Sequence, residues 1–185
     1  MVITIGVLGA CAAASFWAWA DRTQDHWQRW GLSPSAIRLR GEWYRFLTSI
    51  FFHADFFHLL MNGIVFYSFG SLMERAYGMK LYSALLGMGA LGSGLATYLR
   101  YRHNPYHLSI GLSGVVNAVL FHFIVLYPQT TLLVWFIPLP AWIFALLYIA
   151  YTLYEARRGQ SYINHWAHLG GAAAGVLFTS FSPFR

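Results

Sequence analysis

Six apolar segments run through this chain, and each is nearly long enough to cross a membrane. A helix needs about 20 apolar residues to span the hydrocarbon core of a bilayer. Backbone groups in lipid must find hydrogen-bond partners within the chain, so we expect all six segments to be helices. The pattern predicts an all-α membrane protein with six transmembrane helices. The six segments cover residues 2–20, 57–73, 81–99, 112–127, 131–154 and 165–181.

Charged residues are too scarce for a soluble fold. They make up 10% of the 185 residues, and 58% are hydrophobic, whereas a soluble domain carries about 25% charged residues. No repeat or change of composition marks a boundary, so we expect one membrane domain over residues 1–185 with the lipid bilayer as its surroundings. The chain has no basic run that could follow a phosphate backbone, which argues against nucleic-acid binding.

The first apolar segment and the loop after it need separate interpretation. A signal peptide begins with basic residues, but Met1–Thr4 contains none, so we expect residues 2–20 to remain as a helix. Trp17 and Trp19 suit an interfacial position. The loop 21–56 is rich in aromatic and aliphatic residues as well as charges. We predict that it forms amphipathic structure lying partly in the membrane interface.

A serine and a histidine in apolar helices are the candidate catalytic residues. Ser113 lies at the start of a short apolar segment, and His168 lies 55 residues later in another. A serine near a helix start is often a cap, and a buried histidine is often a satisfied core group. A serine also becomes a nucleophile when a histidine takes its proton. We expect Ser113 to face His168 in a water-filled recess.

Neighbouring residues support this hypothesis. Gly171 and Gly175 share one face of the His168 helix, and Gly114 gives the Ser113 helix a matching small face, which allows close packing. His58 and Asn62 are spaced i, i+4 and project from one helix face. They either link two helices or supply donors to an oxyanion hole.

Two features that the sequence lacks restrict the possible catalytic mechanisms. No apolar helix carries a carboxylate suited to be a third triad member, so we expect a serine–histidine dyad. No His-Glu-x-x-His motif occurs either, so the sequence predicts no metal site and no cofactor.

In this order and spacing, the motifs resemble those of the rhomboid family of intramembrane serine proteases. Gly111-Leu112-Ser113-Gly114 matches the family's Gly-x-Ser-Gly motif. Ala167-His168-Leu169-Gly170-Gly171 with Gly175 matches its Ala-His-x-x-Gly-x-x-x-Gly motif, and His58 with Asn62 matches its His-x-x-x-Asn pair. The resemblance implies that Ser113 is the nucleophile, His168 the general base, and His58 with Asn62 the oxyanion hole.

Two further motifs resemble structural motifs of the family. Trp43 and Arg45 resemble the tryptophan–arginine motif of its first loop, with one residue inserted between them. Glu74, between Gly70 and Gly78, resembles the glutamate of its Gly-x-x-x-Glu-x-x-x-Gly motif, which implies a structural role.

Two residues depart from the family pattern. Asn117 stands where many members have a tyrosine that packs on the catalytic histidine. His165 stands three residues before His168, where small or polar residues are common. We expect activity to survive both changes.

The resemblance implies cleavage of transmembrane segments in single-span or multi-span membrane proteins, in a bacterial plasma membrane. The alternative is a catalytically silent rhomboid-like protein that binds membrane clients. The family's topology places both termini in the cytoplasm, which conflicts with the positive-inside rule. Nine of the twelve Lys and Arg residues then lie outside: Arg22, Arg29, Arg38, Arg40, Arg45, Arg100, Arg102, Arg157 and Arg158.

Overall fold

The computed structural model describes residues 1–21 and 25–182, and most of these residues are helical. This confirms the predicted helical class. The helices are α1 (Val2–Ala20), α2 (Asp25–Trp30), α3 (Pro34–Arg40), α4 (Arg45–Thr48), α5 (Phe56–Val65), α6 (Ser71–Tyr101), α7 (Ser113–Leu126), α8 (Ala141–Arg158) and α9 (His165–Phe181), with a 3-10 turn η1 (Ser49–Phe51) and a π-helical turn η2 (Phe66–Gly70). Two short strands, β1 (Thr131–Val134) and β2 (Ile137–Pro140), form a hairpin.

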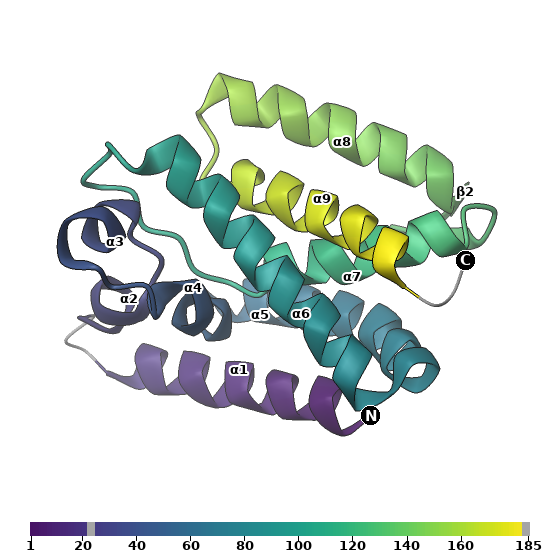
Figure 1. Ribbon diagram of the computed structural model, residues 1–185, viewed down its shortest axis with the longest axis horizontal. Helices are drawn as coiled ribbons and strands as arrows, with labels where there is room; N and C mark the ends of the chain where they lie inside the picture. The colour runs from purple at the N-terminus through teal and green to yellow at the C-terminus, as the bar shows by residue number, and fades with distance from the viewer. Residues whose placement is uncertain (22–24, 183–185) are drawn as a thin grey trace.

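The long helices form a bundle, with α9 packed against both α6 and α7 (Figure 1). Every residue of α7 from 114 to 124 is buried, which is the pattern of a helix surrounded on all sides. The short helices α2, α3 and α4 lie at the end of the bundle opposite the start of α1 (Figure 1). The helix that begins with Ser113 is therefore the centre of the fold.

The second and third predicted segments form one continuous helical run that bends sharply at Gly78. This residue has φ +66° and ψ 178°, inside α6. A positive φ favours glycine, which lacks the Cβ that would clash with the backbone. The bend separates residues 56–77 from residues 79–101, close to the predicted segments 57–73 and 81–99.

Two helical stretches of the described residues have the length and apolarity needed to cross a membrane. They are Val2–Ala20 and Phe56–Tyr101, the latter including the bend at Gly78, and Ser113–Leu126 is a shorter apolar helix. The number of crossings therefore stays a prediction.

The predicted helix over 131–154 is wrong in its first part. Residues 131–140 form the β1–β2 hairpin, and the helix begins at Ala141. Pro138 and Pro140 explain the difference, because proline removes a helical hydrogen bond and clashes with the preceding turn. The turn residues Trp135 and Phe136 have φ values of 48° and 68°, and two-residue hairpin turns favour such positive values.

The long first loop is folded into short helices held together by Arg45. This side chain is 3% exposed. Its Nη1 atom donates hydrogen bonds to the carbonyl oxygens of Gln28 at 2.8 Å and Gly31 at 2.6 Å, and its Nε atom pairs with Glu42. The hydrogen bond from Arg40, together with Arg45, lowers the pKa of the Glu42 carboxyl to about 2. From residue 25 onward, the loop is therefore an ordered part of the fold.

Candidate active site

The peptide leading to Ser113 is fixed by backbone contacts with the first loop. Leu32 and Ser109 exchange two backbone hydrogen bonds, of 2.8 and 3.0 Å, and the Gly111 amide donates to the Ser49 carbonyl at 3.0 Å. Gly111 has φ +122°, and a Cβ there would lie 2.7 Å from Cε1 of His58. Glycine is therefore required at 111 both by the backbone conformation and by the imidazole beside it.

His53 holds the next residue of this peptide. Its Nε2 atom accepts the Leu112 amide at 3.3 Å, so the neutral ring carries its proton on Nδ1, which lies 3.2 Å from Ser15 Oγ. The ring is fully buried, and burial, with a smaller contribution from His58, lowers its pKa to about 4. The sequence gives no signal for the role of His53, because one histidine in a loop has no informative spacing.

His168 faces Ser113 across the α7–α9 contact. His168 Nε2 lies 2.8 Å from Ser113 Oγ. The start of α9 is capped by Asn164, whose side chain accepts the Ala167 amide at 3.1 Å and donates to Thr97 and Ser109. A serine hydroxyl at this distance from a neutral imidazole nitrogen can give up its proton to that nitrogen.

Glycines set how closely the two helices approach. A Cβ on Gly171 would lie 2.0 Å from the Gly114 carbonyl oxygen, and one on Gly175 would lie 2.0 Å from the Ala118 carbonyl oxygen. A Cβ on Gly114 would lie 2.3 Å from Cβ of Ser93 on α6, so this glycine sets the contact between α7 and α6. No larger residue fits at these three positions without moving a helix.

The other nitrogen of the His168 ring contacts a tyrosine that no sequence motif marks. His168 Nδ1 lies 3.1 Å from the hydroxyl of Tyr148 on α8. Among the described residues, no ion pair joins His168 to a carboxylate. The only sequence signal for Tyr148 was indirect: Asn117 replaces the tyrosine that usually accompanies this histidine.

His58 and Asn62 lie on α5 beside the serine peptide. His58 Nδ1 accepts the Ala54 amide at 3.4 Å, which leaves the proton of the neutral ring on Nε2, the nitrogen nearer Gly111. Asn62 is buried and donates one hydrogen bond from Nδ2 to the His58 carbonyl at 2.9 Å. Each side chain therefore retains one N–H that these contacts do not use.

The other motif residues make contacts of a structural kind. Glu74 accepts hydrogen bonds from the amides of Ile3 and Thr4, both at 2.9 Å, and from the Thr4 hydroxyl at 2.7 Å. A carboxylate suits this place because a helix N-terminus is positively polarised. Trp43 is largely exposed and stacks on Phe46, with ring centroids 5.9 Å apart.

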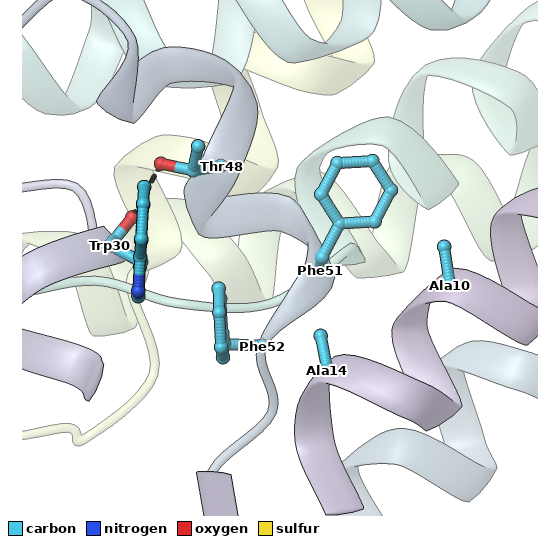
Figure 2. A pocket seen from close by; sticks show the side chains of 6 residues that line it. All are labelled: Ala10, Ala14, Trp30, Thr48, Phe51 and Phe52. Atoms are coloured by element: carbon cyan, nitrogen blue, oxygen red, sulfur yellow. Dashed lines mark hydrogen bonds between the residues drawn. The ribbon is translucent and has the colours of Figure 1, made fainter. Parts of the chain in front are cut away.

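An apolar hollow of about 290 Å³ lies away from the serine–histidine pair. Figure 2 shows Trp30, Phe51 and Phe52 facing Ala10 and Ala14 of α1 across it. None of its lining residues belongs to the pair. The water-filled recess over Ser113 therefore remains a prediction.

The fold is a bundle of helices, and its central apolar helix starts at a serine that contacts a histidine. The protein therefore belongs to the class of helical proteins with a serine–histidine site in apolar surroundings. The Rhomboid domain pattern matches residues 40–182. The chain belongs to the rhomboid family and is an integral membrane protein, as the sequence motifs predicted.

Relatives in several organisms carry the same family name. The chain is 33% identical over 156 residues to the RHOMBOID-like protein 12, mitochondrial, of Arabidopsis thaliana, covering 74% of this chain and 46% of the relative. It is 29% identical over 135 residues to the Rhomboid protein 1, mitochondrial, of Saccharomyces cerevisiae, covering 70% and 39%. It is 33% identical over 91 residues to the Rhomboid protease GluP of Bacillus subtilis, covering 49% and 17%. The chain thus spans less than half the length of these relatives.

Proposed function

We propose that this protein is an intramembrane serine endopeptidase that uses Ser113 and His168 as a catalytic dyad. The observation that carries the proposal is the 2.8 Å separation of His168 Nε2 and Ser113 Oγ. This is hydrogen-bonding distance for a nucleophile and its base, in surroundings that are largely apolar. The name of the Bacillus relative, a rhomboid protease, supports the same activity.

The reaction follows the usual order of acyl transfer. His168 Nε2 takes the Ser113 proton as Oγ attacks the carbonyl carbon of the substrate. The oxyanion accepts hydrogen bonds from Asn62, His58 and backbone N–H groups near Ser113. His168 then gives its proton to the leaving amine, and water hydrolyses the acyl-enzyme by the same steps. Loss of one oxyanion donor usually lowers the rate by about 10²–10³.

The proposed substrates are transmembrane segments of single-span or multi-span membrane proteins. A helical substrate hides its peptide bonds in its own hydrogen bonds, so it must unwind before Ser113 can reach one. We therefore expect cleavage near residues that weaken a helix, such as Gly or Pro. α8 and the loop 159–164 after it are the proposed gate for entry.

The proposed architecture is a single six-span domain over residues 1–185. Its crossings are α1, residues 56–77, residues 79–101, α7, α8 and α9. Both termini are proposed to face the cytoplasm, with α2, α3 and α4 outside.

The proposed location is a bacterial plasma membrane. The mitochondrial names of the plant and yeast relatives argue against a bacterial location, whereas the Bacillus relative supports it. Immunodetection in fractionated cells of the source organism tests the location.

Cleavage by matched serine variants tests the activity. We expect the purified wild type to cleave a single-span model substrate in detergent and Ser113→Ala to lose cleavage by at least about 10³-fold. Ser68→Ala is the control, because Ser68 is exposed and its hydroxyl donates to the carbonyl of Ile64, one turn earlier in the chain. Equal cleavage by wild type and Ser113→Ala contradicts the proposal.

The second candidate is a silent rhomboid-like protein that binds membrane clients, and the names of the mitochondrial relatives leave it open. It predicts that the wild type binds the same single-span substrate but leaves it intact, as Ser113→Ala does. Wild-type cleavage together with an inactive Ser113→Ala variant rules it out.

A further inference from the structure

His168 contacts a hydroxyl group through each of its two ring nitrogens. Ser113 Oγ and Tyr148 Oη lie on opposite sides of the imidazole, 2.8 Å from Nε2 and 3.1 Å from Nδ1. A base that accepts the serine proton must present an unprotonated Nε2, so the proton of the neutral ring is on Nδ1. Tyr148 Oη is then the acceptor of the Nδ1–H group.

Two further polar side chains lie near the Tyr148 hydroxyl. The side chains of Asn117 and Thr152 both interact with it. Asn117 Oδ1 is buried and has no hydrogen-bond partner in the described part of the chain. Asn117 Nδ2 in turn donates to the Ser113 carbonyl at 2.8 Å. Ser113, His168 and Tyr148 are thus linked in a row, and Asn117 bonds the carbonyl of the same serine.

We infer that Tyr148 is the positioning residue of this site, which holds His168 with Nε2 toward Ser113. The inference rests on the proposed function and deepens it. In serine hydrolases the atom that orients the base also stabilises the imidazolium formed during attack. A tyrosine oxygen accepts the Nδ1–H bond before and after His168 gains the serine proton, so it serves both purposes without becoming charged.

The role of the Tyr148 hydroxyl is separable from the packing of its ring. The ring lies 5.6 Å from the rings of Phe121 and Phe144, and phenylalanine keeps these contacts. Tyr148→Phe therefore removes one oxygen and leaves the apolar packing of α8. Tyr154→Phe is the matched control, because Tyr154 is on the same helix, is 59% exposed and contacts Arg158 through its ring face.

The first test compares the reactivity of the serine in these variants. Hydrogen bonds to charged groups typically change an equilibrium or rate by about tenfold or more. We expect Tyr148→Phe to lower both kcat and the rate of Ser113 labelling by a fluorophosphonate about tenfold, with KM and the detergent melting temperature unchanged. Tyr154→Phe should match wild type in all four measurements. The inference is overturned if Tyr148→Phe reacts at the wild-type rates. It is also overturned if a fall in the melting temperature of this variant accounts for its lower rates.

The second test observes the hydrogen bond without activity. In 15N-histidine-labelled protein, the His168 resonance is the one missing from His168→Ala. We expect it to report a protonated Nδ1 in wild type and in Tyr154→Phe, and a changed Nδ1 shift in Tyr148→Phe. An unprotonated Nδ1 in wild type overturns the inference even in an active enzyme. Failure of wild type to label or cleave refutes the proposed function itself, and the inference falls with it.

Discussion

Single polar residues hold the serine peptide in place, and His53 is the clearest case. A fully buried imidazole bonds the Leu112 amide through Nε2 and contacts Ser15 of α1 through Nδ1. Both contacts belong to the neutral ring, because a protonated Nε2 cannot accept from an amide. Protonation of His53 would therefore release the residue next to the nucleophile.

This arrangement predicts a loss of stability in acid. The pKa of His53 falls from 6.5 in the unfolded chain to about 4 in the fold, so its contribution is complete above pH 6.5 and is lost as the pH falls to about 4. A shift of one pKa unit corresponds to about 1.4 kcal/mol, so the contribution is at most about 3.5 kcal/mol. We expect the unfolding free energy of wild type to fall more steeply over this range than that of His53→Gln.

Denaturation in detergent between pH 4 and pH 7 measures both slopes. His107→Gln is a useful comparison, since burial also lowers the pKa of His107 to about 4. That variant should flatten the slope but leave the labelling of Ser113 unchanged. Parallel curves for wild type and His53→Gln would contradict the prediction.

At the scale of elements, the contact between α7 and α9 decides whether the serine and histidine meet. Gly114 and Gly171 lie backbone to backbone, with no room for a Cβ on Gly171. Small residues in membrane helices permit this approach, and the sequence pattern indicated which faces carry them. The hairpin 131–140 was not predicted, because its apolar residues look the same as a helical segment until the two prolines are weighed.

Enlarging Gly171 should therefore separate the pair. We expect Gly171→Ala to lower the unfolding free energy by about 1–3 kcal/mol or more through overpacking, and to abolish fluorophosphonate labelling of Ser113. Gly87→Ala is the control, since a Cβ at Gly87 meets nothing within 4 Å and alanine favours a helix interior. Normal labelling of Gly171→Ala would show that α7 and α9 adjust without harm to the site.

At the scale of the whole molecule, the bundle separates the short helices of the first loop from the start of α1 (Figure 1). In the proposed topology, these two ends lie on opposite sides of the membrane. The family topology places the loop outside, although most of the basic residues then lie outside as well. The positive-inside rule counts charges near helix ends, and here several loop arginines take part in the fold, as Arg45 does.

Cysteine accessibility tests the orientation. In a Cys11→Ala background, we expect a membrane-impermeant maleimide to label Arg38→Cys in intact cells and Arg75→Cys only after the membrane is opened. Both positions are exposed, so a lack of reaction cannot be ascribed to burial in the fold. Labelling of Arg75→Cys alone in intact cells would reverse the proposed topology.

The sequence by itself determined the membrane class, the family and the residue types at the site, because apolar length and motif spacing are local properties of a chain. Only the tertiary structure decided that Ser113 and His168 lie within hydrogen-bonding distance, that the base meets Tyr148, and that His53 holds Leu112. Each of these contacts joins residues 20 or more positions apart. Such distances depend on how closely helices pack, which a single sequence does not specify.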